Sequence, residues 1–177
     1  STDFLQLKSA PTAMANFAGR LFIFDSNNIY KVNPHTLAIE DEFNGIGCSG
    51  KNSIVITEFG MFFADRNGCY SHDGSMPRKI SLAIEKGGET DMLTLSNSSE
   101  DETREIHDVS WFNTGGNSEN MIPMVTWDSS RTSVLFFVEL KALKQHSSQS
   151  TTTVRPGLSI IKLCWAYNVA KTRWDLW

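Results

Sequence analysis

A hairpin pattern that recurs after 40 residues constrains the fold of this chain more than any other feature. Each copy places β-branched and aromatic residues before a polar turn and a second apolar segment after it, which is the pattern of a β-hairpin. The shared residues are Asp25, Asn27 and Tyr30 in the first copy and Asp65, Asn67 and Tyr70 in the second. Gly68 supplies the positive-φ backbone that short hairpin loops require. The pattern therefore predicts two related hairpins.

A second recurrent spacing extends each hairpin. An aromatic residue is followed three positions later by Asn or Asp, and the pairs are Tyr30 and Asn33, Tyr70 and Asp73, and Trp165 and Asn168. Side chains of Asn and Asp hydrogen-bond to the backbone two residues further on and so begin turns. Gly74 favours the second of these turns. We expect a further strand after each turn.

A strand before each hairpin completes three four-stranded units. The predicted units span residues 10–44, 46–84 and 119–177. A period near 40 residues is typical of β-propellers, which have roughly four to eight blades. The predicted fold class is therefore mainly β, with propeller-like blades of four antiparallel strands in a single region over residues 1–177. Because only three units are visible and the chain stops inside an expected strand, we expect an incomplete propeller or a fragment of a larger protein.

Two polar stretches interrupt the repeat. The first, an acidic insertion over residues 85–118, holds eight of the twenty acidic residues between Glu85 and Asp108. Within it, residues 98–107 have a serine cap and charged residues that favour one or two helical turns. The second, residues 141–159, is interpreted as a long loop. Both stretches are compatible with solvated loops or with arms that contact a partner.

Composition excludes several classes of protein. A net charge of −4 argues against binding a polyanion across the whole surface. No apolar run reaches the ~20 residues of a membrane-spanning helix. The three cysteines are far apart and suggest no disulfide framework. We expect Cys69 and Cys164 to be buried in strands, and Cys48, which lies near glycines, to be accessible.

No arrangement of residues predicts catalysis, a cofactor or a metal. The segment 45–52 is close to a phosphate-binding loop, but β-branched residues follow it where that loop needs a helix. The turn residues around Asp65 lack the spacing of a calcium loop. The four histidines have no metal-ligand spacing. We therefore expect the chain not to be an enzyme and to hold no cofactor.

The second unit resembles a known family. Its matching residues are Gly45, Gly47, Phe63, Asp65, Gly68, Tyr70, Asp73, Gly74, Pro77, Ile80 and Ser81. Segment 45–81, about a fifth of the chain, is similar to the repeat of tailed-bacteriophage virion proteins with β-propeller repeats, of the tail nozzle or tail-hub kind. The resemblance implies a structural role in the virion and carries over no catalytic residue.

The expected function is thus that of a structural component of a phage particle, in the tail nozzle, hub or channel wall. Its expected partners are other tail proteins and copies of itself, with DNA passing during ejection without specific binding. Glu100, Asp101, Glu102 and Glu105 are expected to face a lumen or a basic patch on a partner. The expected location is the virion, assembled in the host cytoplasm. Two alternatives stay open: a receptor- or glycan-binding module, and a kelch-like protein-interaction propeller.

Overall fold

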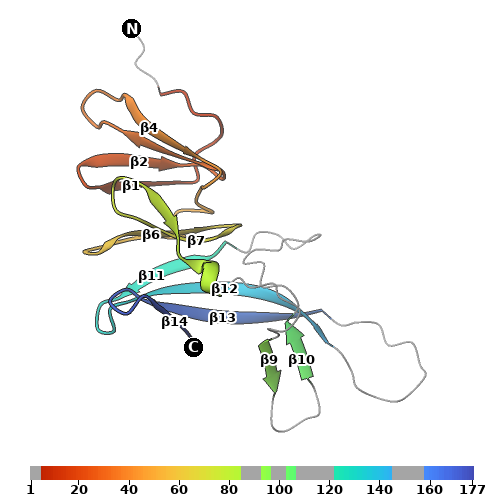
Figure 1. The fold of residues 1–177 in the computed structure, drawn as a ribbon. Helices are drawn as coiled ribbons and strands as arrows, with labels where there is room; N and C mark the ends of the chain where they lie inside the picture. The colour runs from red at the N-terminus through yellow and green to blue at the C-terminus, as the bar shows by residue number, and fades with distance from the viewer. Residues whose placement is uncertain (1–4, 85–92, 97–102, 107–121, 145–157) are drawn as a thin grey trace.

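The computed structural model describes residues 5–84, 93–96, 103–106, 122–144 and 158–177 (Figure 1). Within these residues the chain is mainly β, as predicted, and the single helical element is the short 3₁₀ helix η1 (Ser81–Ala83). None of the described helical residues forms a segment long and apolar enough to cross a membrane.

Three antiparallel sheets follow one another along the chain. The first contains β1 (Ala13–Phe17), β2 (Arg20–Phe24), β3 (Asn28–Val32) and β4 (Ile39–Asn44) in that order. The second contains β5 (Ile54–Thr57), β6 (Gly60–Asp65), β7 (Gly68–His72) and β8 (Pro77–Lys79). The third is built on β11 (Met124–Asp128), β12 (Ser133–Lys144), β13 (Leu158–Asn168) and β14 (Arg173–Leu176). Each of these sets is a meander in which consecutive strands pair.

Local sequence explains why the strands turn where they do. The loop between β1 and β2 consists of Ala18 and Gly19, and both residues have positive φ. Two-residue hairpin loops favour this backbone because its twist matches that of the flanking strands. The apolar and aromatic residues of β2 and β6 favour extended backbone. An Asp or Asn residue directly follows β2, β3 and β7, and Asp65 is the last residue of β6. Each of these residues begins the turn after its strand.

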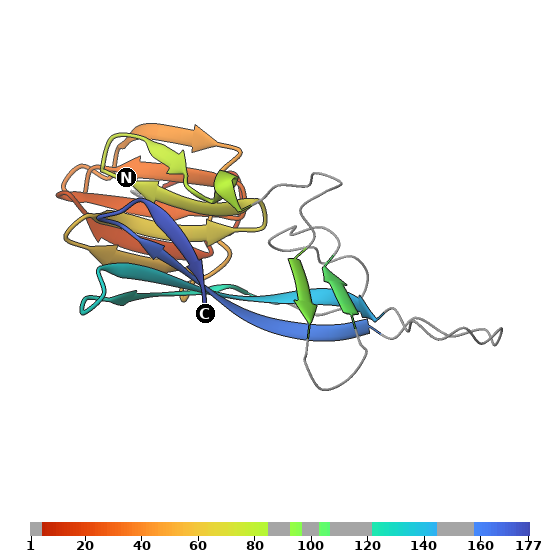
Figure 2. The same cartoon turned by 60° about the horizontal axis from the view of Figure 1, so that its bottom comes forward.

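The three sheets are stacked as successive layers (Figures 1 and 2). One core lies between the first and second sheets and is rich in aromatic rings, including Phe24, Phe63 and Tyr70. The other lies between the second and third sheets and includes Phe62, Phe136 and Trp165. The second sheet is therefore buried on both faces, and all six residues of β6 are buried.

Two expectations about the interruptions were wrong within the described residues. Part of the stretch expected to be helical, β10 (Thr103–Ile106), is a strand that pairs with β9 (Leu93–Ser96). Strand β10 also pairs with the far end of β12 and enlarges the third sheet. The loop expected over 141–159 was wrong at both of its ends, because β12 continues to Lys144 and β13 starts at Leu158, and these strand ends pair with each other. Pairing with distant strands overrides local preference in both cases.

Candidate functional site

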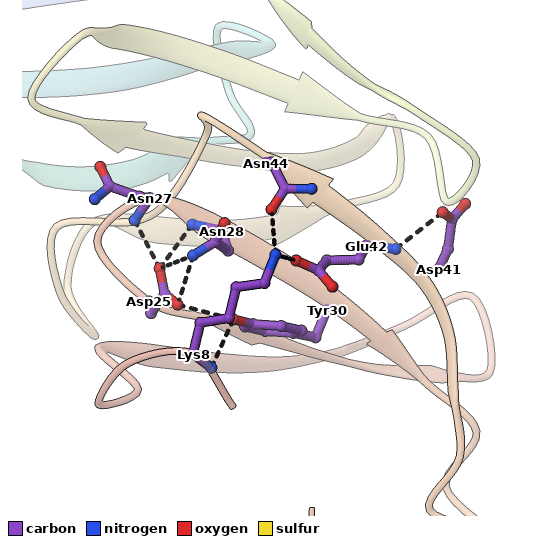
Figure 3. A network of polar contacts seen from close by, with 8 residues as sticks. All are labelled: Lys8, Asp25, Asn27, Asn28, Tyr30, Asp41, Glu42 and Asn44. Atoms are coloured by element: carbon purple, nitrogen blue, oxygen red, sulfur yellow. Dashed lines mark hydrogen bonds and ion pairs between the residues drawn. The ribbon is translucent and has the colours of Figure 1, made fainter. Parts of the chain in front are cut away.

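The first Asp turn joins β2 to β3 around a buried carboxylate (Figure 3). Oδ1 of Asp25 accepts hydrogen bonds from the backbone amides of Asn27 and Asn28, both at 2.7 Å. Its Oδ2 accepts from the Asn28 side-chain amide at 2.9 Å and from the Tyr30 hydroxyl at 3.1 Å. Burial raises the pKa of Asp25, but hydrogen bonds from Asn28, Asn27 and the Ser9 side chain outweigh it and lower the pKa to about 2. The carboxylate is a structural group with its acceptor capacity largely used.

The network in Figure 3 extends to the segment that precedes β1. The Lys8 backbone amide donates to the Tyr30 hydroxyl at 3.1 Å, and its ammonium group donates to Asn44 at 2.8 Å and pairs with Glu42. Leu5 and Leu7 pack on the same face of the first sheet. The segment before β1 therefore covers part of the outer face of that sheet.

The second Asp turn repeats the geometry between β6 and β7. Asp65 Oδ1 accepts from the backbone amides of Asn67 at 2.7 Å and Gly68 at 3.0 Å. Tyr70 also bonds to this carboxylate, as Tyr30 does in the first turn. Here Gly68 replaces Asn28 and offers no side-chain amide, and burial raises the pKa of Asp65. The repeated Asp and Tyr residues thus close hairpins in both sheets.

The two Asp turns meet at Gly47. Its backbone amide donates to Asp65 Oδ2 at 3.3 Å, and an added Cβ would lie 2.4 Å from the carbonyl oxygen of Asp25. The neighbouring Cys48 amide donates to that same oxygen at 3.0 Å. Arg66 reaches from the second turn to the Asn27 side chain at 2.9 Å. The predicted repeat residues therefore also join the first sheet to the second.

The remaining predicted repeat residues mark other turns. Asn33 Oδ1 accepts from the His35 amide at 3.0 Å, and Asp73 Oδ1 accepts from the Ser75 amide at 2.9 Å. Asn168 Oδ1 accepts from the Lys171 amide at 2.8 Å. Trp165 is buried in the core against the second sheet, and Gly74 lies at positive φ.

Sequence reasoning missed Asp128, which accepts from the Ser130 amide at 3.0 Å in the turn between β11 and β12. The sequence Asp-Ser-Ser between two apolar segments was the available signal.

The first junction between sheets is closed at one corner by His72. Its ring lies 4.9 Å from that of Phe22 and 5.4 Å from that of Phe43, centroid to centroid. Its Nδ1 accepts from the Gly74 amide at 2.9 Å, and its Nε2 has no hydrogen-bond partner among the described residues. Lys31 crosses from the first sheet and donates to the Gly74 carbonyl oxygen at 2.9 Å. Burial lowers the pKa of His72, which is consistent with a neutral ring.

The second junction leaves a pocket at the corresponding corner. Its volume is about 230 Å³, and it lies between strands β6 to β8 and the end of β13 with the turn that follows. Its walls include Phe59, Phe62 and Tyr167, with Ser71 and Asp73 among the polar residues. Phe59 also packs against Trp127 of the third sheet.

The face of the third sheet that points away from the second sheet is exposed and partly apolar. Side chains alternate along its strands, so that Val125 and Phe136 are buried while their neighbours Met124 and Phe137 are 55% and 43% exposed. Met124 and Phe137 are also direct cross-strand partners. Two adjacent strands therefore present a shared apolar patch to solvent.

Two of the three cysteines differ from expectation. Cys48 was expected to be accessible, but it is fully buried in the core between the first two sheets, and burial raises the pKa of its thiol to about 12. Cys69 is buried as expected, whereas Cys164, which was also expected to be buried, is half-buried.

The structure does not describe the side chains of the four acidic residues that were expected to face a lumen or a partner. Glu100, Asp101 and Glu102 lie outside the described residues, and Glu105 lies in β10, for which only the backbone is described. No group of His, Cys, Asp or Glu with metal-binding geometry is present in the ranges that the structure covers.

No known family model matches the chain, and no curated protein is significantly similar to it. The described residues thus offer hydrogen-bonded turns, a pocket at the second junction and an exposed apolar face on the third sheet.

Proposed function

We propose that this chain is a structural module of a bacteriophage particle, part of the tail, whose sheets act as blades of a larger propeller-like assembly. The observation that carries the proposal is the exposed apolar face of the third sheet around Met124 and Phe137. The second sheet is covered on both faces by its neighbours, and blades of a propeller bury their faces in the same way. The third sheet has such a neighbour on one face only among the described residues.

The order of the strands also supports blades. Each sheet contains a four-stranded meander, which β9 and β10 extend in the third sheet, and hydrogen bonds link the first strands of the second and third meanders. The Val125 amide of β11 donates to the Asn52 carbonyl oxygen just before β5, and the Ser53 hydroxyl donates to the Pro123 carbonyl oxygen at 2.5 Å. In a propeller the first strands of the blades lie side by side around the axis. The phage assignment itself rests on the resemblance of segment 45–81 to tail repeats.

The test uses phage particles whose genome encodes this chain. Met124→Glu places a charge on the proposed contact face, where burying it against a neighbouring blade is unfavourable. Leu82→Glu is the matched control, because Leu82 is an exposed apolar residue in η1. Quantitative mass spectrometry of purified particles should find the chain in the wild type, little of the Met124 variant and a normal amount of the Leu82 variant. Absence of the wild-type chain from particles would contradict the phage assignment, and equal incorporation of both variants would contradict the contact face.

A further inference from the structure

The two sheet junctions can be compared position by position, because the repeat defines equivalent residues. Counted from the aromatic residue of each unit, Lys31, Ser71 and Ala166 are equivalent, as are His72 and Tyr167. Phe22 and Phe62 are equivalent when the two Asp turns are aligned. The ring pair Phe22–His72 at the first junction therefore corresponds to the pair Phe62–Tyr167 at the second, 6.3 Å between centroids.

The junctions differ in what closes this corner. At the first, the Lys31 ammonium crosses from one sheet to the next and donates to the carbonyl oxygen of Gly74. At the second, the equivalent residue is Ser71, and the residue equivalent to Gly74 is Val169. Both Ser71 and Val169 line the pocket. The pocket thus lies where the second junction lacks the lysine that the first junction has.

We propose that this pocket binds the side chain of a lysine from a partner protein, which takes the place that Lys31 has at the first junction. Its volume of about 230 Å³ is below the roughly 300–1,000 Å³ of pockets for drug-sized ligands, so that it suits one side chain. Phe59, Phe62 and Tyr167 line the pocket, and aromatic side chains of this kind can hold the aliphatic stem of a lysine and attract its ammonium group.

Charge at the pocket supports a cation. Asp73 lines it, and hydrogen bonds from Ser75 and Met76 hold the pKa of Asp73 well below its ordinary value, so that its carboxylate is ionised at neutral pH. Among the described residues that line the pocket, Arg78 carries the opposing charge and lies 3.9 Å from Asp73. The Arg78 side chain is 76% exposed and can turn into solvent. The identity of the partner as another particle protein rests on the proposed function, whereas the chemistry of the pocket does not.

The first experiment supplies the missing lysine within the chain. Ser71→Lys should close the corner as Lys31 does and raise the thermal midpoint by about 2–4 °C. Ser71→Met is the matched control, since its side chain offers an apolar stem without the ammonium group, and we expect a smaller rise. A Ser71→Lys variant that is no more stable than Ser71→Met, or that fails to fold while Ser71→Met folds, would overturn the proposal.

The second experiment uses the wild-type chain and needs no variant to fold. Titration with Nα-acetyl-lysinamide should shift the backbone NMR signals of Ser71 and Val169, with Nα-acetyl-norleucinamide binding about tenfold more weakly because it lacks the ammonium group. Equal binding of the two compounds, or none, would contradict a lysine site. Neither experiment involves a particle, so failure here leaves the particle test of the proposed function unaffected.

Discussion

Replacement of Asp25 by Asn should destabilise the chain strongly, because it removes the buried charge at the centre of the first Asp turn. The carboxylate accepts hydrogen bonds from the backbone of Asn27 and Asn28, the Asn28 side chain and the Tyr30 hydroxyl. An Asn side chain has a single acceptor oxygen and would direct its amide towards groups that donate. Hydrogen bonds to charged groups contribute about 1.5–3 kcal/mol each and are not additive, so we expect a loss of about 2–4 kcal/mol at pH 7.

The lowered pKa of Asp25 expresses the same hydrogen bonds as a dependence of stability on pH. A carboxyl with an ordinary pKa of 3.8 and a pKa of about 2 in the fold contributes about 2 kcal/mol of stability from its ionised form. Since the pKa is lower in the folded state, this contribution is fully present above pH 3.8 and is lost as the pH falls through 3.8 towards 2. The difference in stability between wild type and Asp25→Asn should therefore narrow by about 2 kcal/mol over that range.

Urea unfolding followed by tryptophan fluorescence measures both quantities. Asp73→Asn is the matched control, because Asp73 also accepts backbone amides at the start of a turn but is largely exposed. Its loss should be about half that of Asp25→Asn or less. Equal losses for the two variants, or a difference from wild type that does not change with pH, would refute the assignment of Asp25 as a buried, hydrogen-bonded charge.

Three further predictions follow from buried groups. Gly47→Ala should lower the free energy of unfolding in urea by about 3 kcal/mol, because its Cβ would overlap backbone atoms of the first Asp turn. The control Gly50→Ala meets only a side chain and should lower it by less than about 1 kcal/mol. Similar losses for the two variants would contradict the close approach of Gly47 to the turn. Burial lowers the pKa of His72, so wild-type stability should fall as the pH drops below 6.5, and His72→Phe should remove that part of the pH dependence; an unchanged profile would be inconsistent with this. Cys164 should react with a thiol reagent before Cys48, and the opposite order would show that the core between the first two sheets is open.

The hairpins were predictable from sequence because their determinants are local. Asp25 and Asp65 accept hydrogen bonds from amides two and three residues further on. The spacing of the turn residues in the sequence is therefore sufficient to predict the turn. The same holds for Asn33, Asp73 and Asn168. The mainly β class was confirmed for this reason, whereas the phage origin, the absence of enzymatic activity and the virion location remain predictions.

The features that sequence reasoning missed depend on distant contacts. Cys48 lies near glycines, which suggested exposure, but Asp25 from the first sheet holds its amide and the core covers its thiol. The charged residues of Thr103–Ile106 are compatible with a helix, and pairing with β9 and β12 decides for a strand. No local sequence pattern predicts the burial of Cys48 or the strand at Thr103–Ile106, since each depends on which distant segments pack or pair together.

The two junctions differ in the residues that close them, whereas the two Asp turns share theirs, so the repeat is strong at turn positions and weak at junction positions. Every sheet must close its own hairpins with the same backbone geometry, so the Asp and Tyr of the turns recur in the first two units. A side chain that crosses a junction instead meets whatever the next sheet presents. Lys31 meets the Gly74 carbonyl oxygen beside a histidine, while Ser71 faces a pocket walled in part by Tyr167. Specific binding in a protein built from such repeats should therefore arise at junction positions, where the repeated residues leave the sequence free to differ.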